Sequence, residues 1–247
     1  MVKHMTKPKG AVISLYDFTG EALKPWAENG YDCYAFDIQH PKSGRTHEGI
    51  NYRHADLHDP RTIDDLLKEF KSKPVVFGMA FPVCTDMAVS GAAWFKKKAE
   101  ADPEFQNKAV RYAKSCAEFF DCLQVPYFVE NPVSVLATKW RKPDFSFHPY
   151  EYGGYIPEDE AAHPRWPEYI EARDAYRKKT CLWTGGEFEM PQKKCVDPEG
   201  YHGNGYSTSM MKLGGKSQRT KDIRSATPRG FAKAIYEQAA INGMENL

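Results

Sequence analysis

Apolar and polar positions divide the first half of the chain into short strand-like runs and longer amphipathic runs. The strand-like runs are rich in β-branched and aromatic residues, and the helix-like runs repeat apolar residues every three or four positions. The predicted strands span 10–18, 31–38, 50–57, 74–81 and 126–132, and the predicted helices span 20–30, 60–70 and 103–123. This strand–helix alternation predicts a parallel sheet whose successive strands are joined by right-handed crossovers.

The pattern changes beyond residue 132. Segment 141–170 is dense in proline, glycine and aromatic residues, which indicates an ordered but irregular wall facing a substrate. A further strand at 178–185 and a closing helix at 226–241 are expected. We therefore predict an α/β fold with a doubly wound, mostly parallel sheet. Its main α/β domain is predicted to comprise 1–185 plus 224–247, with 186–223 as a short insertion.

Composition and charge narrow the class of protein without naming a function. The 247 residues carry a formal net charge of +1, and no apolar run approaches the roughly 20 residues of a membrane span. The N-terminus has no secretory pattern, and the six cysteines form no CxxC pair, so we expect reduced thiols inside the cell. Basic residues crowd 212–233, which suits either phosphate binding or a solvated face.

Acidic residues follow the first three predicted strands. Asp17 ends the first strand, Asp37 the second and Asp56 the third, and Gly20 lies in the first loop. Such an edge fits a nucleoside cofactor, with a glycine allowing close approach and a carboxylate accepting hydrogen bonds from ribose hydroxyls. The first loop is not G-x-G-x-x-G, and no phosphate-binding G-x-x-x-x-G-K-[ST] motif occurs. Each aspartate alone would equally suit a turn or a helix cap.

A thiol and a carboxyl follow the next two strands. Cys84 comes just after Pro82, and Glu130 closes the 126–132 run. Neighbouring parallel strands end at the same edge, so these two groups are expected to face one pocket, where a thiolate beside a carboxylic acid can attack a polarised aromatic ring. A buried structural cysteine is the alternative. Cys181, Cys195 and His202 match no common zinc spacing, so no metal is predicted.

Several segments together resemble the cytosine-C5 DNA methyltransferases, which use S-adenosylmethionine (SAM). "LYDFTGEALKPWAENGYDCYAFDIQ" is similar to the first motif and the ribose-binding acid of that family, and "HADLHD" to its adenine-binding motif. "FPVCTDMAVSG" resembles the nucleophile loop and "FVENP" the Glu-Asn motif, whereas "AYRKKTCLWTG" resembles the arginine motif loosely. "IRSATPRGFAKAIYEQ" is similar to the C-terminal motifs. The likeness covers most of the chain in the order of the family.

The resemblance implies a Rossmann-like SAM-dependent methyltransferase fold and a set of site residues. It implies that Cys84 is the nucleophile, that Glu130 acts at ring nitrogen 3, and that Arg177 or Lys179 holds the carbonyl oxygen of the base. The residues implied to hold SAM are Asp17, Phe18, Thr19, Gly20, Asp37, Ile38, Asp56, Leu57 and Pro82. The implied substrate is duplex DNA with its target base flipped out of the stack, in the cytoplasm of a bacterium or of a phage-infected host.

The chain departs from the family at three places. Val83 replaces a second proline before the nucleophile, Ala22 stands where a second glycine is common, and the recognition region 186–223 is short. Two alternatives therefore stay open. The same chemistry could act on a free cytidine nucleotide or on RNA, or the chain could be a non-catalytic nucleic-acid-binding protein that keeps the SAM fold. The aromatic residues from Trp140 to Tyr169 suit either core packing or base stacking.

Overall fold

The computed structural model describes residues 9–198, 213 and 217–245, and within these residues it contains one eight-stranded sheet. The strand order is β3-β4-β2-β1-β5-β6-β8-β7. The strands are β1 (Ala11–Leu15), β2 (Asp32–Asp37), β3 (Arg45–His47), β4 (Ile50–His54), β5 (Val75–Ala80), β6 (Tyr127–Pro132), β7 (Phe145–Phe147) and β8 (Thr180–Gly185). The predicted strands at 10–18, 31–38, 50–57, 74–81, 126–132 and 178–185 are confirmed.

The central strands β4, β2, β1, β5 and β6 are parallel, and the edges are antiparallel. β3 pairs with β4, β8 pairs with β6, and β7 pairs with β8, all in antiparallel register. β2 and β4 lie on one side of β1 in the sheet, and β5 and β6, which come later in the chain, lie on the other side. The boundary between β1 and β5 is therefore a topological switch point, where α/β sheets place ligands at the carboxyl edge.

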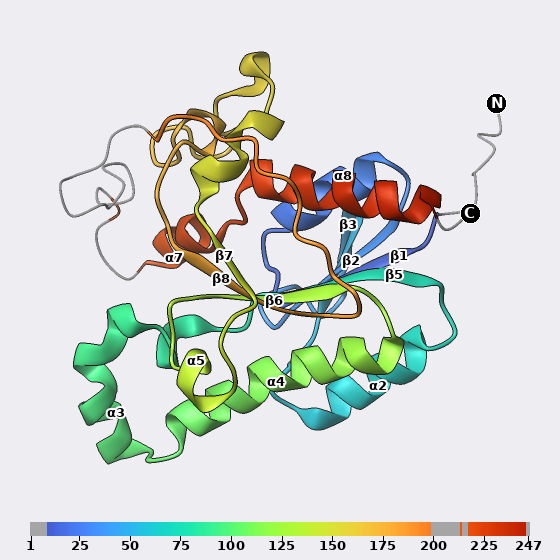
Figure 1. The fold of residues 1–247 in the computed structure, drawn as a ribbon. Helices are drawn as coiled ribbons and strands as arrows, with labels where there is room; N and C mark the ends of the chain where they lie inside the picture. Colours follow the sequence, from blue (N-terminus) through green and yellow to red (C-terminus); the bar gives the residue numbers. More distant parts are fainter. Residues whose placement is uncertain (1–8, 199–212, 214–216, 246–247) are drawn as a thin grey trace.

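Helices cover both faces of the sheet, as Figure 1 shows. The helices are α1 (Lys24–Glu28), α2 (Pro60–Phe70), α3 (Phe95–Ala101), α4 (Phe105–Leu123), α5 (Leu136–Lys139), α7 (Gln218–Ser225) and α8 (Arg229–Glu245). α8 lies with α1 on one face, and α2 lies beside α4 on the other. The predicted α/β fold with a doubly wound, mostly parallel sheet is thereby confirmed. No helix in the described ranges is both long and apolar enough for a membrane span.

Two apolar layers hold the helices to the sheet. Ile13 and Leu15 of β1 pack toward α2 and α4, whereas Val12 packs toward α1 and α8, so that β1 is buried on both faces. A fully buried central strand of this kind accounts for the continuous apolar run in the sequence. Gly78 in β5 is required by a close approach, because a Cβ atom there would lie 2.3 Å from Cδ1 of Phe120 on α4.

The predicted recognition insertion begins as part of this same body. Residues 186–198 run back along the η4 turn (Pro149–Tyr155), where Gly154 N donates to Lys194 O at 2.8 Å and Val196 N to Tyr150 O at 2.9 Å. Phe188 and Met190 pack against the core beneath α8. The insertion therefore starts as a segment packed against the same layers as the sheet, and 199–212 and 214–216 lie outside the described residues.

Candidate functional site

Hydrogen bonds join the loop after β5 to the end of β6. The buried side-chain amide of Asn131, only 1% exposed, donates from Nδ2 to Pro82 O at 2.9 Å. Farther along, Val89 N donates to Val133 O at 3.0 Å, and Val135 N donates to Met87 O at 3.0 Å. The segment that carries Cys84 is therefore fixed against the segment that carries Glu130.

Cys84 opens a single 3₁₀ turn, Cys84–Asp86. The turn forms because Met87 N and Ala88 N both donate to Cys84 O, at 2.9 and 2.8 Å. Cys84 is exposed as a residue, whereas Cys33, Cys116 and Cys181 are buried in the core. Pro82 is itself buried, so its ring stiffens the entry to the turn. The arrangement presents a thiol at the carboxyl edge of the sheet.

The thiol and the carboxyl influence each other electrostatically. Burial raises the pKa of Glu130, and the nearby Lys178 ammonium opposes that rise. Although Cys84 is exposed as a residue, desolvation by the surrounding protein raises the pKa of its thiol, the Glu130 carboxylate raises it further, and Lys178 again opposes the rise. The nucleophile that the resemblance implies needs the thiolate, but these surroundings favour the protonated thiol. Glu130, in contrast, is biased toward the acid form that donation to a ring nitrogen requires.

A small pocket lies over Glu130, where β6, β7 and β8 meet the start of α8. Its walls combine aromatic rings with a few polar groups, and its free volume of about 10 Å³ is room for about one water molecule. Cys84 does not line it, so the structure does not bring the thiol and the carboxyl into one pocket as the sequence predicts. The lining residues are Phe81, Glu130, Phe147, Lys178, Thr180, Ser225, Ala226, Thr227, Pro228 and Phe231. The segment between α7 and α8, which the C-terminal motif of the sequence covers, thus forms one wall of this pocket.

The basic residue that influences both Cys84 and Glu130 is Lys178 rather than Arg177 or Lys179. Lys178 lines the pocket and influences the pKa of both Cys84 and Glu130. The Arg177 guanidinium lies 5.5 Å from the centroid of the Tyr150 ring, and Lys179 influences the pKa of Cys181 on the opposite face of β8. The sequence could not show which of these three consecutive basic residues faces Glu130, because all three precede β8, which begins at Thr180.

Asp17 shapes the first loop from within. Its carboxylate, 4% exposed, accepts hydrogen bonds from Gly20 N at 2.7 Å, from Ser14 Oγ at 2.8 Å and from Thr19 Oγ1 at 3.3 Å. Through these three hydrogen bonds the Asp17 carboxylate stabilises the turn after β1. Gly20 has φ 71°, and a Cβ atom there would lie 2.4 Å from the hydroxyl of Tyr52. The loop therefore requires glycine, as the sequence indicates.

The other predicted cofactor residues meet where β2 and β4 end. Asp37 accepts from Gln39 N at 2.8 Å through Oδ1, and its backbone carbonyl accepts from Ala55 N at 3.2 Å. Ile38, next along the chain, is 57% exposed. Asp56 is exposed and accepts from His58 N at 3.0 Å. Apolar and acidic groups thus share one edge. Leu57 is different, because its side chain belongs to the core.

Phe18 leads to a residue that the sequence did not single out. Its ring stacks on His40, with centroids 5.6 Å apart. His40 is 3% exposed, and its Nε2 lies 3.0 Å from Asp17 O. The imidazole therefore packs against the Phe18 ring and contacts the first loop at the Asp17 carbonyl. A histidine three residues past a strand carries no distinctive spacing, so only the coordinates reveal this role.

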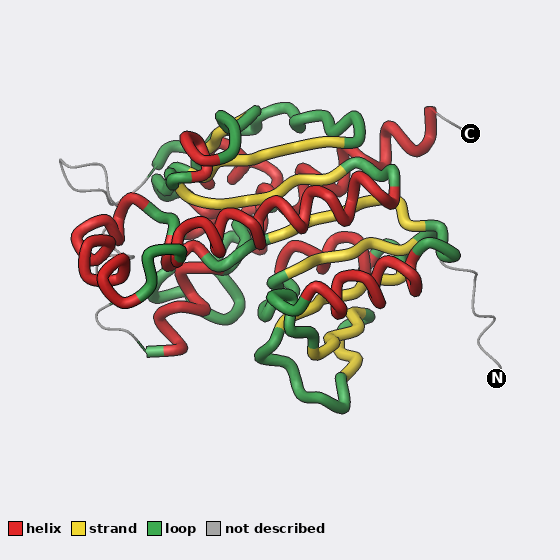
Figure 2. Tube along the Cα trace, turned by 90° about the horizontal axis from the view of Figure 1, so that it is seen from below, coloured by secondary structure: helices red, strands yellow, loops and turns green. Residues whose placement is uncertain are grey.

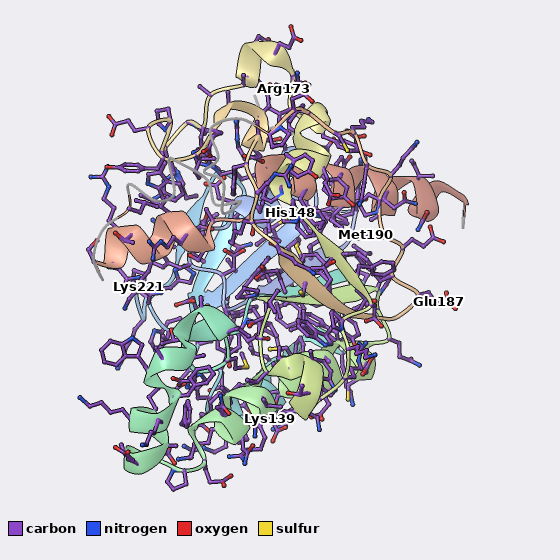
Figure 3. All side chains as sticks on the ribbon, turned by 60° about the vertical axis from the view of Figure 1, so that its left-hand side comes forward. Lys139, His148, Arg173, Glu187, Met190 and Lys221 are labelled. Carbon is purple, nitrogen blue, oxygen red and sulfur yellow. The ribbon has the colours of Figure 1, made fainter. Side chains whose placement is uncertain are left out.

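Exposed basic residues lie on two helices at the edge where β6 ends. Figures 1 and 2 both show α3 and α7 at this end of the molecule. Lys96 and Lys97 on α3 are exposed, and so are Arg219, Lys221 and Arg224 on α7. Figure 3 marks Lys221 on α7 together with Lys139 on α5. The described part of the predicted basic tract is therefore divided, because Arg229 and Lys233 lie on α8 and bond to the segment at Glu160.

No cluster of three metal-binding side chains occurs among the described residues. Cys181 is buried in β8 and Cys195 is exposed, whereas His202 lies outside the described residues. Comparison of the sequence with protein-family models and with curated proteins finds no match to either. The geometry of the site therefore carries the functional argument.

Proposed function

We propose that this chain is a SAM-dependent cytosine-C5 methyltransferase that acts on DNA through a covalent adduct at Cys84. The observation that carries the proposal is the union of the Cys84 loop with the end of β6 through Asn131 and Pro82, with Glu130 close enough to raise the pKa of the thiol. A nucleophile and an acid on adjoining segments are the groups that this reaction requires.

The first loop and the ends of β2 and β4 fit SAM. Gly20 keeps the backbone free of a side chain beside the switch point, Ile38 offers an apolar surface for the adenine, and Asp37 offers a carboxylate for the ribose hydroxyls. Asp56 suits the adenine amino group. When bound, SAM supplies an electrophilic methyl group. The whole fold is accordingly proposed to be of the SAM-dependent methyltransferase type.

The residues of the chain perform the proposed steps on the base. The Cys84 thiolate adds to carbon 6 of cytosine, and the electron pair released from the 5,6 double bond moves toward nitrogen 3. Glu130 hydrogen-bonds or protonates nitrogen 3, so carbon 5 becomes nucleophilic and takes the methyl group. Loss of the proton from carbon 5 and departure of the thiolate restore the aromatic ring.

Charge and exposed apolar groups favour a polymer over a free nucleotide. The lysines of α3 and the basic residues of α7 suit phosphates on either side of a target nucleotide. Val83, Val89 and Val133 are exposed around the Cys84 loop, where apolar side chains can contact the bases next to a flipped one. A free nucleotide would use neither feature, so DNA is the proposed substrate.

Methyl transfer from labelled SAM is the direct test. Duplex DNA, RNA and cytidine monophosphate are compared as substrates, and transfer to DNA alone is expected. Cys84→Ser should abolish transfer. Cys122→Ser, which changes an exposed cysteine at the end of α4, should leave transfer intact. Equal transfer by Cys84→Ser would eliminate the covalent mechanism.

A trapping experiment separates catalysis from mere binding. DNA containing 5-fluorocytosine should form a SAM-dependent covalent complex with the wild-type protein, because fluorine at carbon 5 cannot leave as a proton does. Failure to form that complex, together with tight DNA binding, would favour a non-catalytic binding protein instead.

A further inference from the structure

Lys178 and Glu130 line the same small pocket. Glu130 of β6 is directly opposite Leu182 of β8. Side chains alternate along a strand, so Thr180, at the start of β8, shares that face with Leu182 and Glu130. Lys178 precedes the strand and lines the pocket together with Thr180. Lys179, in contrast, influences the pKa of Cys181.

A neighbouring helix anchors the Lys178 ammonium. Nζ donates to Arg224 O at 2.8 Å, in the last turn of α7. Carbonyls in the last turn of a helix lack partners within it, so they suit a lysine ammonium. An ammonium has three donors, and this contact uses one of them. The side chain is partly buried, so its charge is held at the pocket rather than moving freely in solvent.

The Lys178 charge acts on two groups that desolvation makes harder to ionise. Desolvation by the surrounding protein raises the pKa of both Cys84 and Glu130, and Lys178 opposes each rise. The other titratable groups that sense Glu130 are Tyr176, just before Lys178 in the chain, and Cys181 on β8. Among these groups Lys178 is the positive one, so its removal would leave the thiol beside a carboxylate with no compensating charge.

We propose that Lys178 is a positioning residue whose ammonium, held by the end of α7, sets the balance of protons between Cys84 and Glu130. The consequence for methyl transfer rests on the proposed function, but the electrostatic role does not. Without the ammonium, the Cys84 thiolate forms only at higher pH. Arginine in its place keeps the charge, and glutamine or methionine removes it.

Alkylation of the thiol tests the proposal without any methyl transfer. The rate of iodoacetamide addition to Cys84 is followed from pH 6 to pH 10 by peptide mass spectrometry, with exposed Cys122 and Cys195 as references in the same sample. Lys178→Met should move the Cys84 profile to higher pH. At pH 8 its rate should fall about three- to tenfold, since one pKa unit corresponds to about a tenfold change in thiolate at a fixed pH below the pKa. Lys178→Arg should keep the wild-type profile.

Two further variants keep the result interpretable. Glu130→Gln should move the profile the opposite way, to lower pH, because it removes the negative charge; opposite shifts cannot both come from loss of the fold. Lys178→Gln repeats the charge removal with a polar side chain, and circular dichroism checks that each variant is folded. An unchanged profile in folded Lys178→Gln and Lys178→Met, or an equal shift in Lys179→Met, would overturn the proposal. If the wild-type protein transfers no methyl group but the variants show the predicted alkylation shifts, only the proposed function is refuted.

Discussion

The hydrogen bond between Asn131 and Pro82 offers the sharpest prediction, because it is the buried side-chain bond between the Cys84 loop and the end of β6, which backbone bonds farther along also hold together. Asn131→Ala removes the donor and leaves the Pro82 carbonyl without it in a buried place. An unsatisfied buried acceptor costs about 1–3 kcal/mol. For a chain of this size, about 2 kcal/mol corresponds to a fall of about 4–8 °C in Tm.

The effect on methyl transfer should exceed the effect on stability. At 25 °C the variant remains folded, but the Cys84 loop loses its fixed position relative to Glu130. A misplacement of about 1 Å at a reacting group can cost about a hundredfold in rate, so kcat should fall between about ten- and a hundredfold. Asn131→Asp, which places an acceptor where a donor is needed, should be at least as damaging.

Calorimetry gives Tm, and initial rates with saturating SAM and DNA give kcat. Ser115→Ala is the matched control, since it removes an exposed side-chain hydrogen bond on α4. It should change Tm by less than about 2 °C, because surface substitutions typically alter stability by less than about 0.5 kcal/mol. Normal kcat in Asn131→Ala with a lowered Tm would show that the bond serves stability alone, and an unchanged Tm would refute the energetic reasoning.

Three other substitutions separate the roles of single positions. Gly20→Ala should weaken SAM binding in calorimetric titration by at least tenfold, because it adds a side chain against Tyr52 at a positive φ; undiminished affinity would contradict the proposed cofactor loop. Gly78→Ala should lower the free energy of unfolding by about 1–3 kcal/mol through overpacking against Phe120, with SAM affinity retained; a loss of affinity in the folded variant would count against this separation. Burial raises the pKa of Asp174 from 3.8 to about 6, so the folded state holds that proton more tightly and loses stability as the pH rises from about 4 to above 6. Asp174→Asn should therefore raise Tm relative to wild type at pH 8, with little difference at pH 4, and the reverse pattern in thermal melts would refute the sign.

The sequence predicted the framework of the fold because its strands are strongly apolar and well separated. Buried parallel strands such as β1 and β5 need apolar residues on both faces, and this need is visible in the chain itself. β3 and β7, by contrast, have three residues each, and α5 has four. Elements so short contain no full period, so their formation depends on the neighbours against which they pack.

The candidate site was predicted in part for a similar reason. Cys84 and Glu130 follow consecutive strands, and the ends of neighbouring parallel strands meet, so their approach follows from topology. Which of three consecutive basic residues faces them depends on where β8 begins, and a sequence locates such boundaries poorly. The sequence also does not show that the Asp17 carboxylate is turned inward. Its hydrogen-bond donors lie in β1 and in the loop that follows, and only the folded structure brings them together.

The raised pKa of Cys84 has a consequence for how readily its sulfur is oxidised. Peroxides react with thiolates, so a cysteine that stays protonated is oxidised slowly. Because Cys84 is exposed at the protein surface, its sulfur would otherwise be open to attack by peroxides. The same protonation slows the other reactions of the sulfur, so slow oxidation and low resting nucleophilicity come together at Cys84.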